Sequence, residues 1–221
     1  SALFNYNKNL IANDCSSIED QRISDWRFII PIEKNHTILV LGCGLGVIPI
    51  ALSEHCKRVY AIDPEWGKAA FLNIRKGQLG INNIFPIQGN IIDQLPFDKE
   101  SVDLVVMVGS QYSMGNIYNF TEFTKQVYTL LKDDGKIYFS LDNKLFFPAM
   151  IRNLISMDAK LKHSIFGYKR ILKEKNFLDI KILAPLPQHD KTPMFYLPLD
   201  NNYAIRYFFK NIFPLFEMVT P

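Results

Sequence analysis

Three glycines and one acidic residue are the strongest indication of chemistry in this sequence. Gly42, Gly44 and Gly46 occupy alternate positions within LVLGCGLGVIPI (39–50). Glycine permits tight turns and close approach of the backbone to a ligand, although it costs conformational entropy. Asp63 follows 19 residues after Gly44, where a carboxylate can accept hydrogen bonds from a ribose diol. The spacing therefore predicts backbone lying against a ribose-containing cofactor.

The glycine spacing separates one class of cofactor from another. A dinucleotide fingerprint, GxGxxG, needs its third glycine at position 47, and this chain has Val47 there. The pattern is GxGxG instead, which argues against a nicotinamide-dependent oxidoreductase. The alternative reading, a tight loop that only allows close helix packing, is less consistent with Asp63 and the later motifs.

The elements that must position these residues alternate between strand-like and helix-like apolar patterns. Strands are predicted at 37–41, 58–63, 83–88, 101–108 and 136–142, with helices at 47–56, 65–80, 119–135 and 164–177. Two late strands at 178–184 and 194–200 precede a helix near 202–213. The pattern predicts a doubly wound, Rossmann-like α/β sheet, mostly parallel with an antiparallel C-terminal strand and helices on both faces. Pro86 predicts that the strand 83–88 is irregular or close to a sheet edge.

Five segments in order resemble the motifs of class I S-adenosylmethionine (SAM)-dependent methyltransferases. They are VLGCGLG (40–46), VYAID (59–63), QGNIIDQLPF (88–97), DLVVMVGSQYS (103–113) and LLKDDGKIYFS (130–140). The resemblance covers residues 25–142 as a cofactor-binding core, with 143–221 as a lid or cap within a single domain, 1–221. The C-terminal part is loosely similar to methyltransferases of bacterial polysaccharide and natural-product pathways.

The resemblance implies SAM as the cofactor and assigns a role to each matching residue. These are Gly42, Cys43, Gly44 and Gly46 beside the methionine moiety, Asp63 at the ribose hydroxyls, Pro64, Trp66, Asn90 and Ile91 around the adenine, and Val108 from the strand 101–108. Asn90 stands where the family often has aspartate, and its amide oxygen can still accept the adenine amine. Cys43 is interpreted as a packing residue rather than a nucleophile.

A hydroxyl acceptor requires a general base, and three residues are candidates. Tyr112 follows the strand 101–108, while His163 and His189 lie in later loops. The alternatives are a solvated loop residue for each histidine and a residue packed over the cofactor for Tyr112. The pair Asp142 and Asn143 resembles the magnesium ligands of catechol-type methyltransferases, but the carboxylate expected after the strand 101–108 is missing, so no metal is predicted.

The loop after residue 108 also bears on the acceptor. GSQYSMGN lacks the Asn/Asp-Pro-Pro-Tyr motif of amino-methylating nucleic-acid enzymes and the glutamate pair of the protein-arginine class. The prediction is therefore methyl transfer to a hydroxyl of a small molecule or glycoconjugate in biosynthesis, with nucleic acid excluded. The alternatives are an N-methyltransferase and a SAM-binding, non-catalytic or regulatory domain of a longer protein.

Composition sets the remaining expectations. The net charge of +3 comes from 25 basic and 22 acidic residues in 221 and gives no overall case for nucleic acid. Three cysteines without a CxxC pair favour a reducing, cytoplasmic compartment. No apolar run approaches the ~20 residues that span a bilayer. The oligomeric state is left open.

Overall fold

The computed structural model describes residues 21–90, 95–108, 120–140, 165–186, 195–208 and 210. The chain divides into two compact units, Ser1–Phe177 and Leu178–Pro221, and each is described by itself. A single domain over the whole chain remains a prediction. Among the described helices, none has the length and apolar character that crossing a membrane requires.

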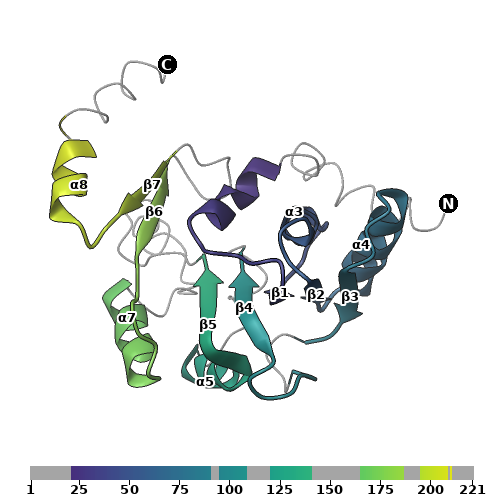
Figure 1. The fold of residues 1–221 in the computed structure, drawn as a ribbon. Helices are drawn as coiled ribbons and strands as arrows, with labels where there is room; N and C mark the ends of the chain where they lie inside the picture. Colours follow the sequence, from purple (N-terminus) through teal and green to yellow (C-terminus); the bar gives the residue numbers. More distant parts are fainter. Residues whose placement is uncertain are drawn as a thin grey trace, which may run out of the picture. The chain divides into compact units, whose positions relative to one another are not determined.

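The first unit contains a parallel sheet of five strands (Figure 1). The strands are β1 (Thr37–Leu41), β2 (Arg58–Asp63), β3 (Ile84–Gln88), β4 (Val102–Met107) and β5 (Leu131–Phe139). Their order in the sheet is β3-β2-β1-β4-β5, and every neighbouring pair is parallel. The strand order reverses between β1 and β4, which is where open α/β sheets bind ligands. The sequence prediction of a Rossmann-like parallel sheet is confirmed, and β3, with Pro86, is an edge strand.

Helices cover both faces of this sheet because successive strand residues point to opposite sides. Among the described residues, the helices of this unit are η1 (Gln21–Phe28), α3 (Val47–Ser53), α4 (Trp66–Gln78), α5 (Phe120–Leu130) and α7 (Ile165–Glu174). On one face, Leu39 and Val105 belong to a core cluster with Val127 of α5 and Ile171 of α7. On the other face, Trp26 of η1 stacks on Tyr138 of β5, with ring centroids 4.1 Å apart.

The junction of α5 and β5 differs from the sequence prediction. A helix was expected to continue to Gly135, but α5 ends at Leu130 and β5 begins at Leu131. The register against β4 shifts between Val102 and Leu104, so residues 132–135, of which 132–134 are exposed, form a bulge. A Cβ at Gly135 would lie 2.8 Å from the Lys132 carbonyl oxygen, so the bend requires glycine.

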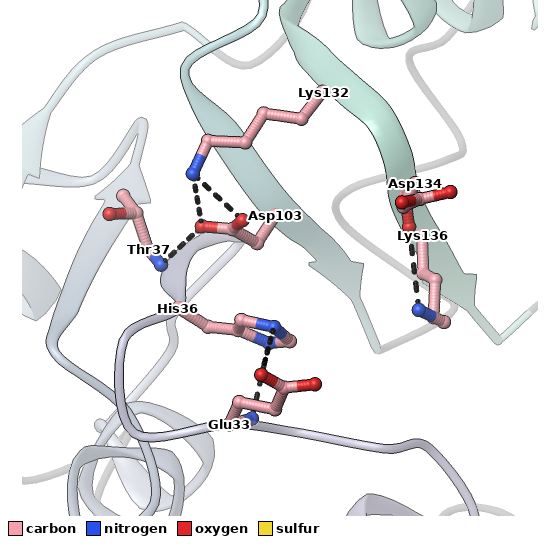
Figure 2. Close-up of polar contacts among 7 residues, drawn as sticks. All are labelled: Glu33, His36, Thr37, Asp103, Lys132, Asp134 and Lys136. Carbon is pink, nitrogen blue, oxygen red and sulfur yellow. Dashed lines mark hydrogen bonds and ion pairs between the residues drawn. The ribbon is translucent and has the colours of Figure 1, made fainter.

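At the amino ends of the strands, Asp103 joins three of them (Figure 2). Its Oδ2 accepts the Thr37 N–H of β1 at 2.7 Å, and Lys132 Nζ of β5 lies 2.8 Å from its Oδ1. Partial burial alone would raise the pKa of Asp103, but Lys132, the Thr37 N–H and His36 together hold that pKa below its ordinary value. This contact is structural, since it lies at the sheet edge opposite to the strand ends that bind ligands.

The second unit contains an antiparallel ribbon and a short helix. β6 (Leu183–Leu186) pairs with β7 (Phe195–Pro198), and α8 (Asn202–Tyr207) follows. The antiparallel pairing predicted for the C-terminal part is therefore present, but it forms a separate two-stranded sheet. The Asn201 side chain begins α8 by accepting the N–H groups of Tyr203 and Ala204.

Candidate functional site

The loop between β1 and α3 turns on its three glycines. Gly42, Gly44 and Gly46 all have positive φ, at 76°, 53° and 87°. Side chains other than glycine rarely adopt this conformation, so the turn selects glycine at each position. The Gly42 and Cys43 N–H groups both donate to the Ile62 carbonyl of β2, at 2.8 and 3.1 Å. The loop is thus fixed to the end of the neighbouring strand.

Asp63, the last residue of β2, holds two backbone segments together. Its Oδ2 accepts the Gly44 N–H at 2.9 Å, and its Oδ1 accepts the Glu65 N–H at 3.0 Å. Its backbone carbonyl accepts the Gly89 N–H beyond β3 at 3.1 Å. The carboxylate therefore aligns the glycine loop and the start of α4 at one sheet edge.

The environment of Asp63 is nearly dry, since the residue is 3% exposed. Burial raises the pKa of its carboxyl above the ordinary value, and the Glu65 and Gly44 N–H groups and the Lys68 ammonium oppose part of that rise. Two of the carboxylate's roughly four lone-pair positions accept backbone N–H groups, so about two remain for other donors. A vicinal diol supplies two hydroxyl donors.

Cys43 is a thiol without nucleophilic character. Burial, and then the negative charge of Asp63, raise the pKa of Cys43 to about 12. At neutral pH almost no thiolate forms, and the thiolate is the nucleophilic species. This geometry agrees with the interpretation of Cys43 as a packing residue.

Two further residues position the site, and sequence reasoning missed both. Arg75, near the end of α4, donates through Nη1 to the Leu45 carbonyl of the glycine loop at 3.1 Å. Lys68 lies 2.7 Å from Glu65 Oε1 at the start of α4, where its charge also reaches Asp63. No local motif marks them, because each acts on backbone or side chains that only the packing of α4 brings within reach.

The described residues of the predicted site gather at the carboxyl ends of β1 to β4. Pro64, Trp66 and Asn90 are exposed there, with Trp66 61% exposed at the start of α4. Val108 follows the last residue of β4 and is partly buried. Ile91 lies outside the described residues, as do the candidate bases Tyr112, His163 and His189 and the pair Asp142 and Asn143. Their assigned roles stay predictions.

Gly44 and Gly46 serve different purposes in the loop. A Cβ at Gly46 would lie 2.5 Å from Leu72 Cδ1, so Gly46 allows α3 and α4 to pack closely. A Cβ at Gly44 would have no neighbour within 4 Å. The backbone at Gly44 is therefore open for a ligand to approach, and its N–H group is hydrogen-bonded to the Asp63 carboxylate. This arrangement fits a ribose-bearing cofactor such as SAM.

The described residues contain no group of three or more histidine, cysteine, aspartate or glutamate side chains that could hold a metal ion. The groups at this edge of the sheet that can bind a ligand are the Asp63 carboxylate, the backbone of the glycine loop and the exposed indole of Trp66. Such a set can bind and orient an organic cofactor, because it offers acceptors for hydroxyls and an aromatic surface for a base.

Part of the chain is similar to a known family of domains. Residues 38–135 match a family described as "Methyltransferase domain". The Ribosomal RNA small subunit methyltransferase G of Legionella pneumophila is 31% identical over 106 residues, which are 47% of this chain and 50% of that protein. The chain thus spans about half the length of the curated relatives it matches. The prediction of a methyltransferase domain is confirmed, and SAM is the cofactor of that family.

Solved structures confirm the fold. The YcgJ protein from Bacillus subtilis is similar with a TM-score of 0.61 and 16% identity, covering 75% of this chain and 73% of that chain. A SAM-dependent methyltransferase from Thermotoga maritima gives a TM-score of 0.61 and 15% identity, covering 84% of each chain. At these identities the likeness establishes the α/β methyltransferase fold and leaves the acceptor undetermined.

The sequence prediction of the partner is wrong. The partner was predicted to be a small molecule or glycoconjugate, with nucleic acid excluded, but a relative at 31% identity is a ribosomal RNA methyltransferase. The exclusion relied on a motif missing from the loop after residue 108. That motif marks one chemistry, transfer to the exocyclic amine of a flipped base, and its absence leaves other nucleic-acid methylation open.

Proposed function

We propose that this chain transfers a methyl group from SAM to RNA. The observation that carries the SAM-dependent step is the contact between Asp63 and Gly44, in residues that match a methyltransferase domain. SAM supplies an activated methyl group on its sulfonium when bound. The acceptor class is supported by the ribosomal RNA methyltransferase that is 31% identical over 106 residues.

The protein's own residues bind and orient in this proposal. The remaining acceptor positions of Asp63 take the two ribose hydroxyls, in a dry environment that strengthens hydrogen bonds. Gly44 lets the backbone lie against the cofactor, and the exposed indole of Trp66 covers the adenine beside Asn90. Arg75 holds the glycine loop in place from behind. Orientation of this kind supplies much of the rate in a transfer whose methyl group is already activated.

The predicted hydroxyl acceptor and its candidate bases, Tyr112, His163 and His189, enter here as an open part of the proposal. A ribose hydroxyl needs such a base, whereas a ring nitrogen with a free lone pair does not. The chemistry of the labelled nucleoside therefore decides between O- and N-methylation.

The test combines binding and transfer. Calorimetry is expected to detect binding of SAM and of its demethylated product, but no binding of NAD. Binding of NAD would instead support the alternative of a nicotinamide-dependent enzyme. Total RNA incubated with protein and methyl-tritiated SAM is then expected to gain label that ribonuclease releases. Asp63→Ala serves as the inactive control. Label that enters a small-molecule extract and not RNA contradicts the acceptor class, and SAM binding without transfer to either supports a non-catalytic domain.

A further inference from the structure

Helix α7 presents a basic face to solvent. Residues 165–177 contain four basic side chains, Lys169, Arg170, Lys173 and Lys175, and one acidic side chain, Glu174. The segment therefore has a net charge of +3, which equals that of the whole chain. The remainder of the protein is therefore balanced. The Arg170 side chain is 78% exposed and lies 3.7 Å from Glu174. Among the described residues, neither Lys169 nor Lys173 has an acidic partner.

Aromatic contacts fix the direction of α7. Tyr168 packs edge-on against Phe120, the first residue of α5, with ring centroids 4.9 Å apart. Phe120 in turn lies 5.7 Å from Phe139, the last residue of β5. At the far end, Phe177 lies 5.4 Å from Tyr128 of α5. The first turn of α7 is therefore near the carboxyl ends of the strands, the edge that carries the cofactor site.

β5 and β1 are separated in the sheet by β4 alone. Two strand spacings are about 10 Å, roughly the rise of three stacked nucleotides at about 3.4 Å each. An RNA strand that follows α7 toward its first turn therefore reaches this edge of the sheet beside β5.

An exposed aromatic ring completes this face. Phe166 is 75% exposed and precedes Lys169, Arg170 and Lys173 by three, four and seven residues, which places all four on one side of the helix. Proteins that bind single-stranded nucleic acid combine cations that follow the phosphates with aromatic rings on which bases stack. We propose that this face, Phe166 with Lys169, Arg170 and Lys173, docks the backbone of the RNA acceptor. The proposal rests on the RNA acceptor of the proposed function.

An anionic membrane is the other partner that a basic helix could fit. A helix that lies on a membrane inserts an apolar face into the lipid. In α7 the apolar residues Ile171 and Leu172 are each 6% exposed and packed inside the protein. Phe166 alone among the large hydrophobic residues of α7 is exposed, which suits stacking and offers little to insert.

The test measures RNA affinity against salt concentration. A fluorescein-labelled single-stranded RNA of 20 nucleotides is titrated by anisotropy with the wild type and with the triple variant Lys169→Ala, Arg170→Ala, Lys173→Ala. Each lost phosphate contact lowers the slope of log K against log salt by about 0.7, so the slope is expected to fall by about 2. Phe166→Ala is expected to weaken binding at least about fivefold with an unchanged slope.

The matched control removes the same charge at the opposite sheet edge. Lys57, Arg58 and Lys99 are exposed near the amino ends of β2 and β4, and their triple alanine variant is expected to keep most of the slope. Equal losses in the two triple variants overturn the proposal, as does a wild type that binds phosphatidylserine vesicles and not RNA. SAM calorimetry on the same proteins separates the two proposals: wild type that fails to bind SAM contradicts the proposed function whatever the anisotropy gives.

Discussion

Asp63 Oδ2 accepts the backbone N–H of Gly44 at 2.9 Å, and this bond joins the end of β2 to the loop that follows β1. Because its second oxygen accepts the Glu65 N–H, the carboxylate has a structural role before any ligand arrives. The same atoms are the proposed acceptors for a ribose diol. In the proposed function, organisation of the loop and binding of the cofactor both depend on this one side chain.

Asp63→Asn tests this double role, because the amide keeps one acceptor oxygen and replaces the other with a donor. SAM binding is expected to weaken by about 10- to 150-fold, the value of one hydrogen bond to a charged group. Calorimetry measures the effect, and a thermal scan shows that the variant is folded. Asp103→Asn, at the opposite sheet edge, is the control and is expected to leave SAM affinity unchanged; an equal loss there contradicts the assignment.

Alanine at Gly44 and at Gly46 should separate the cofactor role from the packing role. Gly44→Ala meets no atom within 4 Å and is expected to cost about 1–2 kcal/mol of stability from its positive φ. Gly46→Ala adds a clash with Leu72 and is expected to cost about 2–5 kcal/mol. Urea denaturation measures both. In the double variant Gly46→Ala, Leu72→Ala the cost is expected to be less than the sum of the single costs, and strict additivity would argue against the contact.

The buried thiols should be inert in the native protein. Burial raises the pKa of Cys43 to about 12 and that of Cys56 to about 11. In a Cys15→Ser background, Ellman's reagent at pH 8 is expected to titrate almost no thiol in native protein and both thiols in denaturant, because the reagent needs exposed thiolate. Rapid native labelling of Cys43, located by peptide mapping, would show that the glycine loop opens.

Acid should weaken the contact between Asp103 and Lys132. A lowered pKa in the folded state means that the unfolded chain binds a proton first as pH falls. The stability that Asp103 contributes is therefore complete above its unfolded pKa, about 3.9, and is lost as pH falls through the lower folded value. At pH 7 the free energy of unfolding of the wild type is expected to exceed that of Asp103→Asn by about 1 kcal/mol or less, because Lys132 is partly exposed. The difference should shrink below about pH 4, and a constant difference from pH 7 to 2 would contradict the assignment.

The order of the elements and the glycine turn after β1 are features that the sequence determined. Strand periodicity and glycine spacing depend on residues a few positions apart, so β1 to β4 and the turn at Gly42 to Gly46 were visible locally. Asp63 was identified by its place at the end of a strand. A missing motif was less informative: the loop after Val108 lacks one nucleic-acid signature, and that absence, together with the low net charge, wrongly excluded an entire partner class.

Only the tertiary structure decided how these parts work together. The bond from Gly44 to Asp63 spans 19 residues and that from Arg75 to Leu45 spans 30, so both exist only once β2 and α4 have packed. The end of α5 at Leu130 depends on β5 pairing with β4, which overrides the helical pattern up to Gly135. The direction of α7 follows from the contact of Tyr168 with Phe120. The local sequence pattern determines whether a segment forms a helix or a strand and which of its faces is exposed. Contacts between segments distant in the sequence determine which elements that face lies beside, and in our proposal the docking of the methyl acceptor depends on those contacts.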